Sequence, residues 1–193
     1  MFKASSYKKK WAYVVGVALG DGNLSNPNGR AVRLRVSCDT KYKNLISKIC
    51  IVIKDILPNN KVSLVNKKGK NCVDISCYSN KWEGLLGWKV GHGSKYEQNA
   101  SVPFWIKKSK GFSIECLRGL LETDGCIYFD RGYKMVHFTN KTKQLSSDVC
   151  SIMEGLGFTP HIYQVKERGS YRYNVRLSKN VDRFIKLINL KKD

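Results

Sequence analysis

Two Asp-Gly pairs, each at the end of an apolar segment, are the residues of this chain whose types and spacing best support chemistry. VVGVALGDG at 14–22 aligns with LRGLLETDG at 117–125, which pairs Gly16 with Gly119, Asp21 with Asp124 and Gly22 with Gly125. A carboxylate at the C-terminal end of a helix meets the negative end of the helix dipole and is unfavourable there. If the two helices pack through Gly16 and Gly119, the two aspartates emerge side by side and repel each other unless a cation lies between them. Hard oxygen ligands suit Mg²⁺, so the pair predicts metal-dependent phosphodiester cleavage.

The alternative is that each Asp-Gly pair is a turn and that each glycine is an ordinary helix C-cap. A repeat along the whole chain favours the metal site over this alternative. With an offset of 100 positions, the matches are Val36/Val136, Lys41/Lys141, Lys43/Lys143, Leu45/Leu145, Val62/Ile162, Val65/Val165, Gly69/Gly169, Ile75/Val175 and Asn80/Asn180. The motif itself repeats at an offset of 103. The three-residue difference between the offsets of 103 and 100 falls in NLSNPNGRAV, which is predicted to be a longer hairpin turn than FDRGYK.

The elements that must position the aspartates also repeat. Helices are predicted at 8–20 and 113–123 and at 41–57 and 142–155, strands at 30–37 and 133–139, and hairpins at 61–66 with 72–78 and 160–165 with 171–177. A final helix is expected near Asn80 and near Asn180, each as an N-cap. We therefore expect an α+β fold of two pseudo-symmetric αββαββα repeats, at 1–87 and 113–193, joined by a linker at 88–112 and packed about a pseudo-twofold axis.

The amino-acid composition limits the kinds of molecule that this protein is expected to bind. The chain has 35 Lys and Arg against 15 Asp and Glu, a net charge of +20, which is typical of proteins that bind a polyanion. Nucleic acid is favoured over an anionic membrane, because no basic amphipathic helix or lipidation signal is present. Seven cysteines without a CxxC pair, with three histidines, disfavour zinc. No signal peptide and no apolar run of about 18 residues is found, so we expect an intracellular protein of the cytoplasm, the nucleoid or an organelle.

The duplicated motif and the repeat resemble the single-chain LAGLIDADG homing endonucleases, from about Lys8 to Leu190. One departure is Glu122, an acid where the first motif has Leu19. The resemblance implies a two-helix motif interface and two saddle-shaped antiparallel sheets, each in the major groove of double-stranded DNA. It also implies that a monomer cuts both strands of a long asymmetric site and leaves 3′ overhangs. A site of roughly two helical turns follows if each half covers about one turn.

The resemblance further implies roles for individual residues. Mg²⁺, with Mn²⁺ or Ca²⁺ able to substitute in binding, would be held by Asp21 and Asp124 with the backbone carbonyls of Gly20 and Thr123. Polar or basic pairs of the family map to Thr40 with Lys41 and to Asn140 with Lys141. The catalytic candidates beside the two aspartates are Lys41, Lys95 and Asn140, and a phosphate contact is an equally open role for each lysine.

Strand alternation predicts which side chains face away from the helices, toward the DNA. Val32, Leu34, Val36, Tyr171, Tyr173, Val175 and Leu177 are expected to point inward. The predicted DNA-contacting residues are Asn23, Ser25, Arg30, Arg33, Arg35, Ser37, Lys61, Ser63, Asp74, Ser76, Tyr128, Tyr133, His137, Lys141, His161, Tyr163, Arg172, Asn174 and Arg176. Arg and Asn among them can form bidentate hydrogen bonds with guanine and adenine in the major groove. Lys107, Lys108 and Lys110 are expected to contact phosphates.

Other functions remain open. An intron maturase, which binds RNA, or a non-cleaving DNA-binding protein could share this fold. Two retained aspartates favour cleavage over both alternatives. A regulator would need an added helix-turn-helix, for which the chain leaves no room. An intein is disfavoured because the chain begins with Met1 and ends in LINLKKD, and a basic structural protein with a solvated sheet face is disfavoured by the paired acids.

Overall fold

The computed structural model describes residues 2–167 and 169–191 and consists of two αββαββα repeats. The first repeat comprises α1 (Phe2–Asp21), β1 (Gly22–Ser25), β2 (Arg33–Asp39), α2 (Lys43–Ile56), β3 (Val62–Asn66), β4 (Cys72–Tyr78) and α3 (Trp82–Leu86). After α4 (Phe104–Lys107), the second repeat comprises α5 (Lys110–Asp124), β5 (Gly125–Asp130), β6 (Tyr133–Asn140), α6 (Lys143–Gly155), β7 (His161–Glu167), β8 (Ser170–Leu177) and α7 (Val181–Ile188). The predicted fold class is confirmed.

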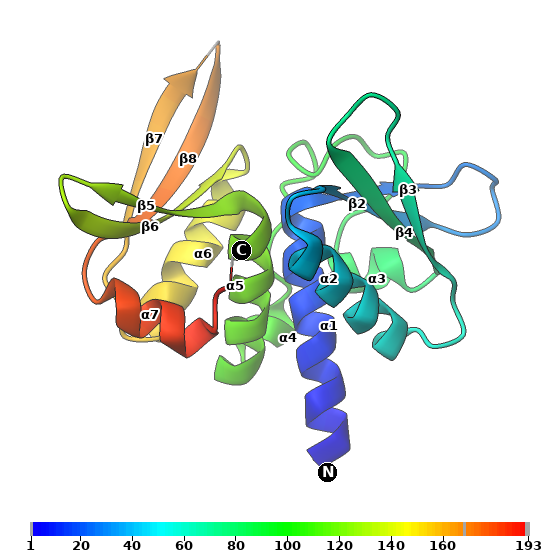
Figure 1. The fold of residues 1–193 in the computed structure, drawn as a ribbon, viewed down its shortest axis with the longest axis horizontal. Coiled ribbons are helices and arrows are strands. Elements are labelled where there is room, and N and C mark those ends of the chain that lie inside the picture. The colour runs from blue at the N-terminus through cyan, green and yellow to red at the C-terminus, as the bar shows by residue number, and fades with distance from the viewer. Residues whose placement is uncertain (1, 168, 192–193) are drawn as a thin grey trace.

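Each repeat carries one four-stranded antiparallel sheet, in the orders β1-β2-β4-β3 and β5-β6-β8-β7. Figure 1 shows the two sheets side by side at one end of the molecule, with helices beneath them and with α1 and α5 adjacent at the centre. The first turn of α5 and all of α4 lie in the segment that was expected to be a linker. Because the helices cover both sheets from beneath, the uncovered outer faces of the two sheets point toward the same side of the molecule (Figure 1).

Helices α1 and α5 approach each other closely through glycine, as predicted. A Cβ atom added to Gly16 would lie 2.1 Å from the carbonyl oxygen of Cys116, and one added to Gly119 would lie 2.4 Å from that of Tyr13. Every residue from Trp11 to Leu19 is buried. A helix that is covered on all sides shows no polar face, which explains why this segment is apolar throughout.

Of the two predicted N-caps, the one at Asn80 is wrong and the one at Asn180 is found at its position without a capping hydrogen bond. Helix α3 begins at Trp82, and its N-cap position is Lys81 rather than Asn80. Asn180 does occupy the N-cap position of α7, but it has a φ of 56° and its side chain makes no capping hydrogen bond. Asparagine adopts a left-handed backbone more readily than most residues do, which suits it to this position.

The strand pairing corrects the repeat alignment in β2 and β6. The single offset of 100 pairs Val36 with Val136. In the sheets, however, Gly22 lies opposite Val36, whereas Gly125 lies opposite Phe138. Because the two glycines are equivalent motif residues, the structural equivalent of Val36 is Phe138, 102 positions later.

A second shift in the opposite direction occurs in β3 and β7. Ile75 and Val175, which are equivalent, face Leu64 and Ile162 respectively. The equivalent of Leu64 is therefore Ile162, 98 positions later. Differences in turn and strand length thus cancel along the chain, which is why one offset fitted the sequence. Both shifts are by two residues, so each side chain keeps its face of the sheet.

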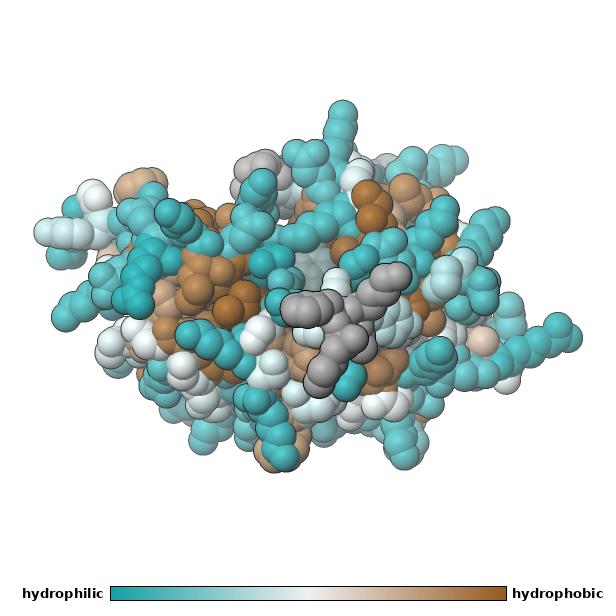
Figure 2. All heavy atoms as spheres, turned by 90° about the horizontal axis from the view of Figure 1, so that it is seen from below, coloured by the Kyte–Doolittle hydropathy of each residue, from teal (hydrophilic) through white to brown (hydrophobic). Residues whose placement is uncertain are grey.

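The end of the molecule away from the sheets is mostly hydrophilic. Figure 2 shows this end, where polar side chains surround smaller apolar areas. Among the described residues, no helix combines the length and apolar composition needed to cross a membrane.

Candidate active site

The two motif helices end at Asp21 and Asp124, under the two sheets. The helix ends are adjacent, because a Cβ atom added to Gly20 would lie 2.0 Å from Thr123 Oγ1 and 3.5 Å from the carboxyl carbon of Asp124. Asp21 is exposed and Asp124 is half-buried. An open cleft of about 480 Å³ adjoins this point and is lined by Gly20, Ser94, Lys95, Tyr96, Asp124, Thr139, Asn140, Lys141, Thr142 and Arg172.

The motif glycines after the aspartates are not left-handed C-caps. Gly125 has an extended backbone with a φ of −94°, and its N–H donates to the carbonyl of Leu121. A Cβ atom would lie 2.4 Å from the Ala18 carbonyl oxygen at Gly22 and 2.5 Å from the Leu121 carbonyl oxygen at Gly125. The glycines therefore allow each strand to turn back directly across the last turn of its helix, which holds each aspartate at the junction of helix and sheet.

Lys95 reaches the end of α1 from the connection between α3 and α4. Its Nζ donates to the carbonyls of Ala18 at 3.1 Å and Leu19 at 2.8 Å, and also to that of Gly20. These carbonyls belong to the last turn of a helix, where carbonyl groups commonly need a partner from outside the helix. Burial lowers the pKa of Lys95 to about 8, although the charges of Asp124 and Asp21 act in the opposite direction. A partly buried ammonium therefore lies at the Gly20 carbonyl, a group that the sequence predicts to be a metal ligand.

The second acid has a different partner. Asn140 Nδ2 donates to Asp124 Oδ2 at 2.8 Å, and Asn140 Oδ1 accepts from the backbone N–H of Thr142 at 2.9 Å. Asn140 is thereby fixed at the start of the connection to α6 and orients the Asp124 carboxylate. The two halves of the site are thus built differently, with a lysine at one helix end and an asparagine at the other.

The donor atoms fit a divalent metal of the Mg²⁺ type. Carboxylates and backbone carbonyls are the hard oxygen ligands that Mg²⁺ and Ca²⁺ prefer. Within residues 2–167 and 169–191, no cluster of three or more His, Cys, Asp or Glu side chains gathers. The ligands predicted from the sequence for such a metal are the two aspartates together with the carbonyls of Gly20 and Thr123.

The other predicted catalytic residue, Lys41, lies outside the cleft. Its Nζ pairs with Asp39 at 3.5 Å and lies 4.8 Å from the centre of the Tyr42 ring, and 63% of its side chain is exposed. Lys95 and Asn140 are therefore the predicted partners that this structure brings to the aspartates. Ser94, Tyr96, Thr139 and Thr142 line the same cleft and were not predicted, because nothing in their local sequence distinguishes them from surface residues.

The sheet faces follow the predicted alternation, with one correction. On β2, Leu34 and Val36 are buried against the helices while the arginines and Ser37 lie on the outer face. Tyr171 was expected to point into the core, yet it is 48% exposed. Strands β7 and β8 extend beyond the helices that would cover it (Figure 1). Arg30 lies in the connection from β1 to β2 and Lys61 immediately precedes β3.

Asp74 organises the outer face of the first sheet. It is 8% exposed and accepts a hydrogen bond from Ser37 Oγ at 2.6 Å, and it pairs with Lys67 at 3.0 Å and with Arg35 Nε at 3.9 Å. Burial raises the pKa of Asp74, but the hydrogen bonds and the positive charges of Lys67 and Arg35 outweigh it and bring the pKa below its ordinary value. Asp74 therefore stays ionised and holds basic side chains in place.

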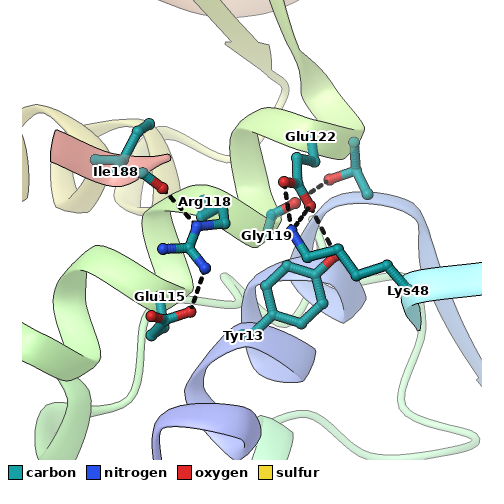
Figure 3. Close-up of polar contacts among 8 residues, drawn as sticks. Tyr13, Lys48, Glu115, Arg118, Gly119, Glu122 and Ile188 are labelled. Carbon is teal, nitrogen blue, oxygen red and sulfur yellow. Dashed lines mark hydrogen bonds and ion pairs between the residues drawn. The ribbon is translucent and has the colours of Figure 1, made fainter. Parts of the chain in front are cut away.

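Glu122, the departure from the motif, links three helices beneath the site (Figure 3). Its carboxylate is 2% exposed and accepts from the Tyr13 hydroxyl at 2.7 Å and from Lys48 Nζ at 2.6 and 2.9 Å. Lys48 Nζ also lies 4.5 Å from the centre of the Tyr13 ring. Burial and the Glu122 charge raise the pKa of Tyr13, so its hydroxyl remains a donor. The network ties α1, α2 and α5 together, and an acid within an apolar motif was its only sequence signal.

Two family models match the chain in separate ranges. The second repeat, residues 111–189, matches the LAGLIDADG-like domain, and residues 10–75 of the first repeat match the WhiA LAGLIDADG-like domain. Among curated proteins, the chain is 27% identical over 185 residues to a DNA polymerase of Thermococcus sp. (strain GE8), which covers 91% of the chain. It is 37% identical over 100 residues, 48% of the chain, to the replicative DNA helicase DnaB of Rhodothermus marinus. The chain spans 10% of the length of each of these relatives.

Solved structures share the whole fold. A mesophilic variant of the homing endonuclease I-DmoI superposes with a TM-score of 0.70 at 18% identity, over 97% of this chain and 99% of that one. I-DmoI in complex with DNA and Ca gives a TM-score of 0.69 at 19% identity, over 95% and 88%. The N-terminal LAGLIDADG domain of DUF199/WhiA gives 0.64 at 12% identity, over 96% and 85%. With both repeats matched by LAGLIDADG models and two motif helices in contact, the chain belongs to the LAGLIDADG family, as a single chain with two repeats.

Proposed function

We propose that this protein is a homing endonuclease that cuts both strands of DNA at one long asymmetric site. The observation that carries the proposal is the position of Asp21 and Asp124, at the adjacent ends of α1 and α5 and beneath two basic sheets. The net charge of +20 favours a polyanionic substrate. The similar I-DmoI was solved with DNA, which supports DNA as that substrate.

The residues at the helix ends suit a divalent metal, and Mg²⁺ is the ion we propose. I-DmoI structures were solved with Ca, Mg and Mn, which supports divalent metals at this fold. Such a metal would supply an activated water and would stabilise the charge on the leaving oxygen. Asp21, Asp124 and the carbonyls of Gly20 and Thr123 would hold it. Asn140 orients the Asp124 carboxylate, and Lys95 places a positive charge beside the phosphate that is cut.

The sheets would supply the target recognition. Their outer faces lie on one side of the molecule, as Figure 1 shows, and each would occupy the major groove of one half-site. Two half-sites of about one helical turn each give a target of roughly two turns. Because one chain carries both aspartates, a monomer is sufficient, and the cuts would leave 3′ overhangs.

A second candidate is a binding protein of the same fold that does not cleave, or an intron maturase. The match of residues 10–75 to the WhiA LAGLIDADG-like domain and the likeness to the WhiA fold favour this candidate. The presence of an aspartate at the end of both motif helices favours the nuclease.

Cleavage of a randomised duplex library in Mg²⁺ tests the proposal. The wild type is compared with Asp21→Asn and Asp124→Asn, which keep the side-chain size and remove the charge. Asp182→Asn is the matched control, because the Asp182 side chain is 83% exposed and pairs only with Lys134 among the contacts of the described residues. A staggered cut at one sequence, lost in the first two variants and retained in the control, is the expected result. Specific binding of DNA or RNA without a cut in Mg²⁺ or Mn²⁺ would refute the nuclease and favour the second candidate.

A further inference from the structure

The outer faces of the two sheets carry different chemistry at equivalent positions. The strand register places these positions in three matching rows. In the first sheet the rows are Asn23, Arg35, Ser76 and Ser63, then Ser37, Asp74 and Val65, then Ser25, Arg33 and Tyr78. In the second sheet they are Cys126, His137, Arg176 and His161, then Thr139, Asn174 and Tyr163, then Tyr128 and Met135. We call these two sets the first face and the second face.

The first face presents guanidinium groups that are held by small polar neighbours. Arg33 Nε donates to Ser25 Oγ at 3.1 Å across the strands, and Arg35 donates to Asn23 Oδ1 at 3.5 Å. Asp74 adds an ionic contact to Arg35 at 3.9 Å. A positioned guanidinium is the side chain best suited to the O6 and N7 acceptors of guanine.

The second face replaces these groups with rings. His137 and Met135 stand where the first face has its two arginines, and Tyr128 and Tyr163 stand where it has a serine and a valine. The ring of His137 lies 6.0 Å from that of Tyr128 and 6.5 Å from that of Tyr163, and Tyr163 lies 5.8 Å from His161. Burial and the charge of Arg176 lower the pKa of His137, which favours its uncharged form. The result is a continuous aromatic surface.

Arg35 and His137 occupy the same position in the two sheets. They are also the described residues with a buried side-chain nitrogen that lacks a hydrogen-bond partner, Arg35 Nε and His137 Nε2. These two nitrogens are enclosed by neighbouring side chains, so the remaining nitrogens of Arg35 and His137 would meet a molecule outside the protein. The two sheets therefore place a cation and an aromatic ring at the same point of their outer faces.

We propose that the first face reads a half-site containing guanine, through Arg33 and Arg35, and that the second face reads a thymine-rich half-site, through contacts of its rings with thymine methyl groups. In the major groove, thymine is the base that presents a methyl group, and apolar side chains recognise it. Arg176, which lies opposite His137 in the strand register, keeps the second face basic. The distinction between the half-sites therefore lies in the rings rather than in charge. The inference rests on the proposed DNA-binding function and adds the composition of its target.

Base analogues test it by binding rather than by cutting. The preferred site is selected from a random duplex library in Ca²⁺, and the bound half-sites are assigned by protection of the selected DNA in the presence of Arg33→Ala or Tyr163→Ala. Deoxyuridine then replaces thymidine in one half-site at a time. We expect affinity to fall about fourfold for each contacted methyl removed under the second face, and to change little under the first. In the first half-site, 7-deazaguanine, which lacks the N7 acceptor, should weaken binding about tenfold.

Variants provide the second arm. Tyr128→Ser, which introduces the residue found at the equivalent position of the first face, should remove the penalty for uracil at the thymines beside it. Tyr171→Ser is the matched control, since Tyr171 lies on the same sheet but on the opposite side and should leave the penalty unchanged. Equal uracil sensitivity in both half-sites, or a selected site without thymine under the second face, would overturn this inference alone. A failure to select any DNA would refute the proposed function as well.

Discussion

Replacing Gly119 by alanine should separate the two motif helices. The added Cβ would lie 2.4 Å from the Tyr13 carbonyl oxygen and 2.7 Å from the Val17 amide nitrogen, where ordinary contacts begin at 3.4 Å. Both atoms belong to helix backbone and cannot rotate away, so the helices must move apart by about 1 Å, the difference between 3.4 and 2.4 Å. Overpacking of this kind costs about 1–3 kcal/mol, whereas alanine elsewhere in a helix gains up to about 1 kcal/mol over glycine.

Subtracting the alanine gain from the middle of the overpacking cost leaves an expected net loss of about 1 kcal/mol, which lowers Tm by about 2–4 °C in a chain of this size. Gly155→Ala in α6 is the matched control, because a Cβ there has no atom within 4 Å and Gly155 has no left-handed backbone. That change should raise Tm by about 2–4 °C. Thermal unfolding followed by circular dichroism measures both. If Gly119→Ala is as stable as the wild type, or if both variants shift in the same direction, the close helix contact described above is wrong.

Three further changes test other parts of the structure. Lys95→Met removes the ammonium that would compete with a metal for the Gly20 carbonyl, so we expect Ca²⁺ to bind about tenfold more tightly when measured by calorimetry. Unchanged or weaker Ca²⁺ binding would argue against this competition. Glu122→Gln should cost about 2 kcal/mol in urea unfolding, less than the loss for a fully buried pair because Lys48 is partly exposed, and an added Lys48→Met should restore part of it. The pKa of Asp74 is lowered in the folded protein, so ionised Asp74 stabilises the fold above the unfolded pKa of about 4, and this stabilisation is lost as pH falls below that value. Asp74→Asn should flatten that part of the curve of unfolding free energy against pH. A curve identical to that of the wild type would contradict the lowered pKa of Asp74.

The sequence was sufficient for the fold class because the information lies in local patterns that occur twice. A glycine five residues before an aspartate, at the end of two apolar helices, predicted both the helix contact at Gly16 and Gly119 and the position of the acids. Alternation along β2 predicted its outer face, since a buried face leaves only one choice for each side chain.

What the sequence could not provide depends on three-dimensional context. The alignment at a single offset failed in β2 and β3, because turns of different length compensate one another without leaving a gap. Tyr171 has the alternation of a core residue but lies beyond the helices that would cover it. Glu122 interacts with residues of two other helices, and no spacing along the chain indicates such a contact.

The two-residue shifts between the sheets have an evolutionary consequence. A slip of two residues moves every outward side chain by about 6.7 Å along its strand, roughly the rise of two base pairs, and it turns no buried residue toward solvent. Small insertions or deletions in hairpin turns can therefore reassign which base a side chain meets while the core stays intact. A duplicated repeat whose turns accept insertions and deletions can thus change its target at several bases in one mutation. The variant protein still folds, because its core residues stay buried.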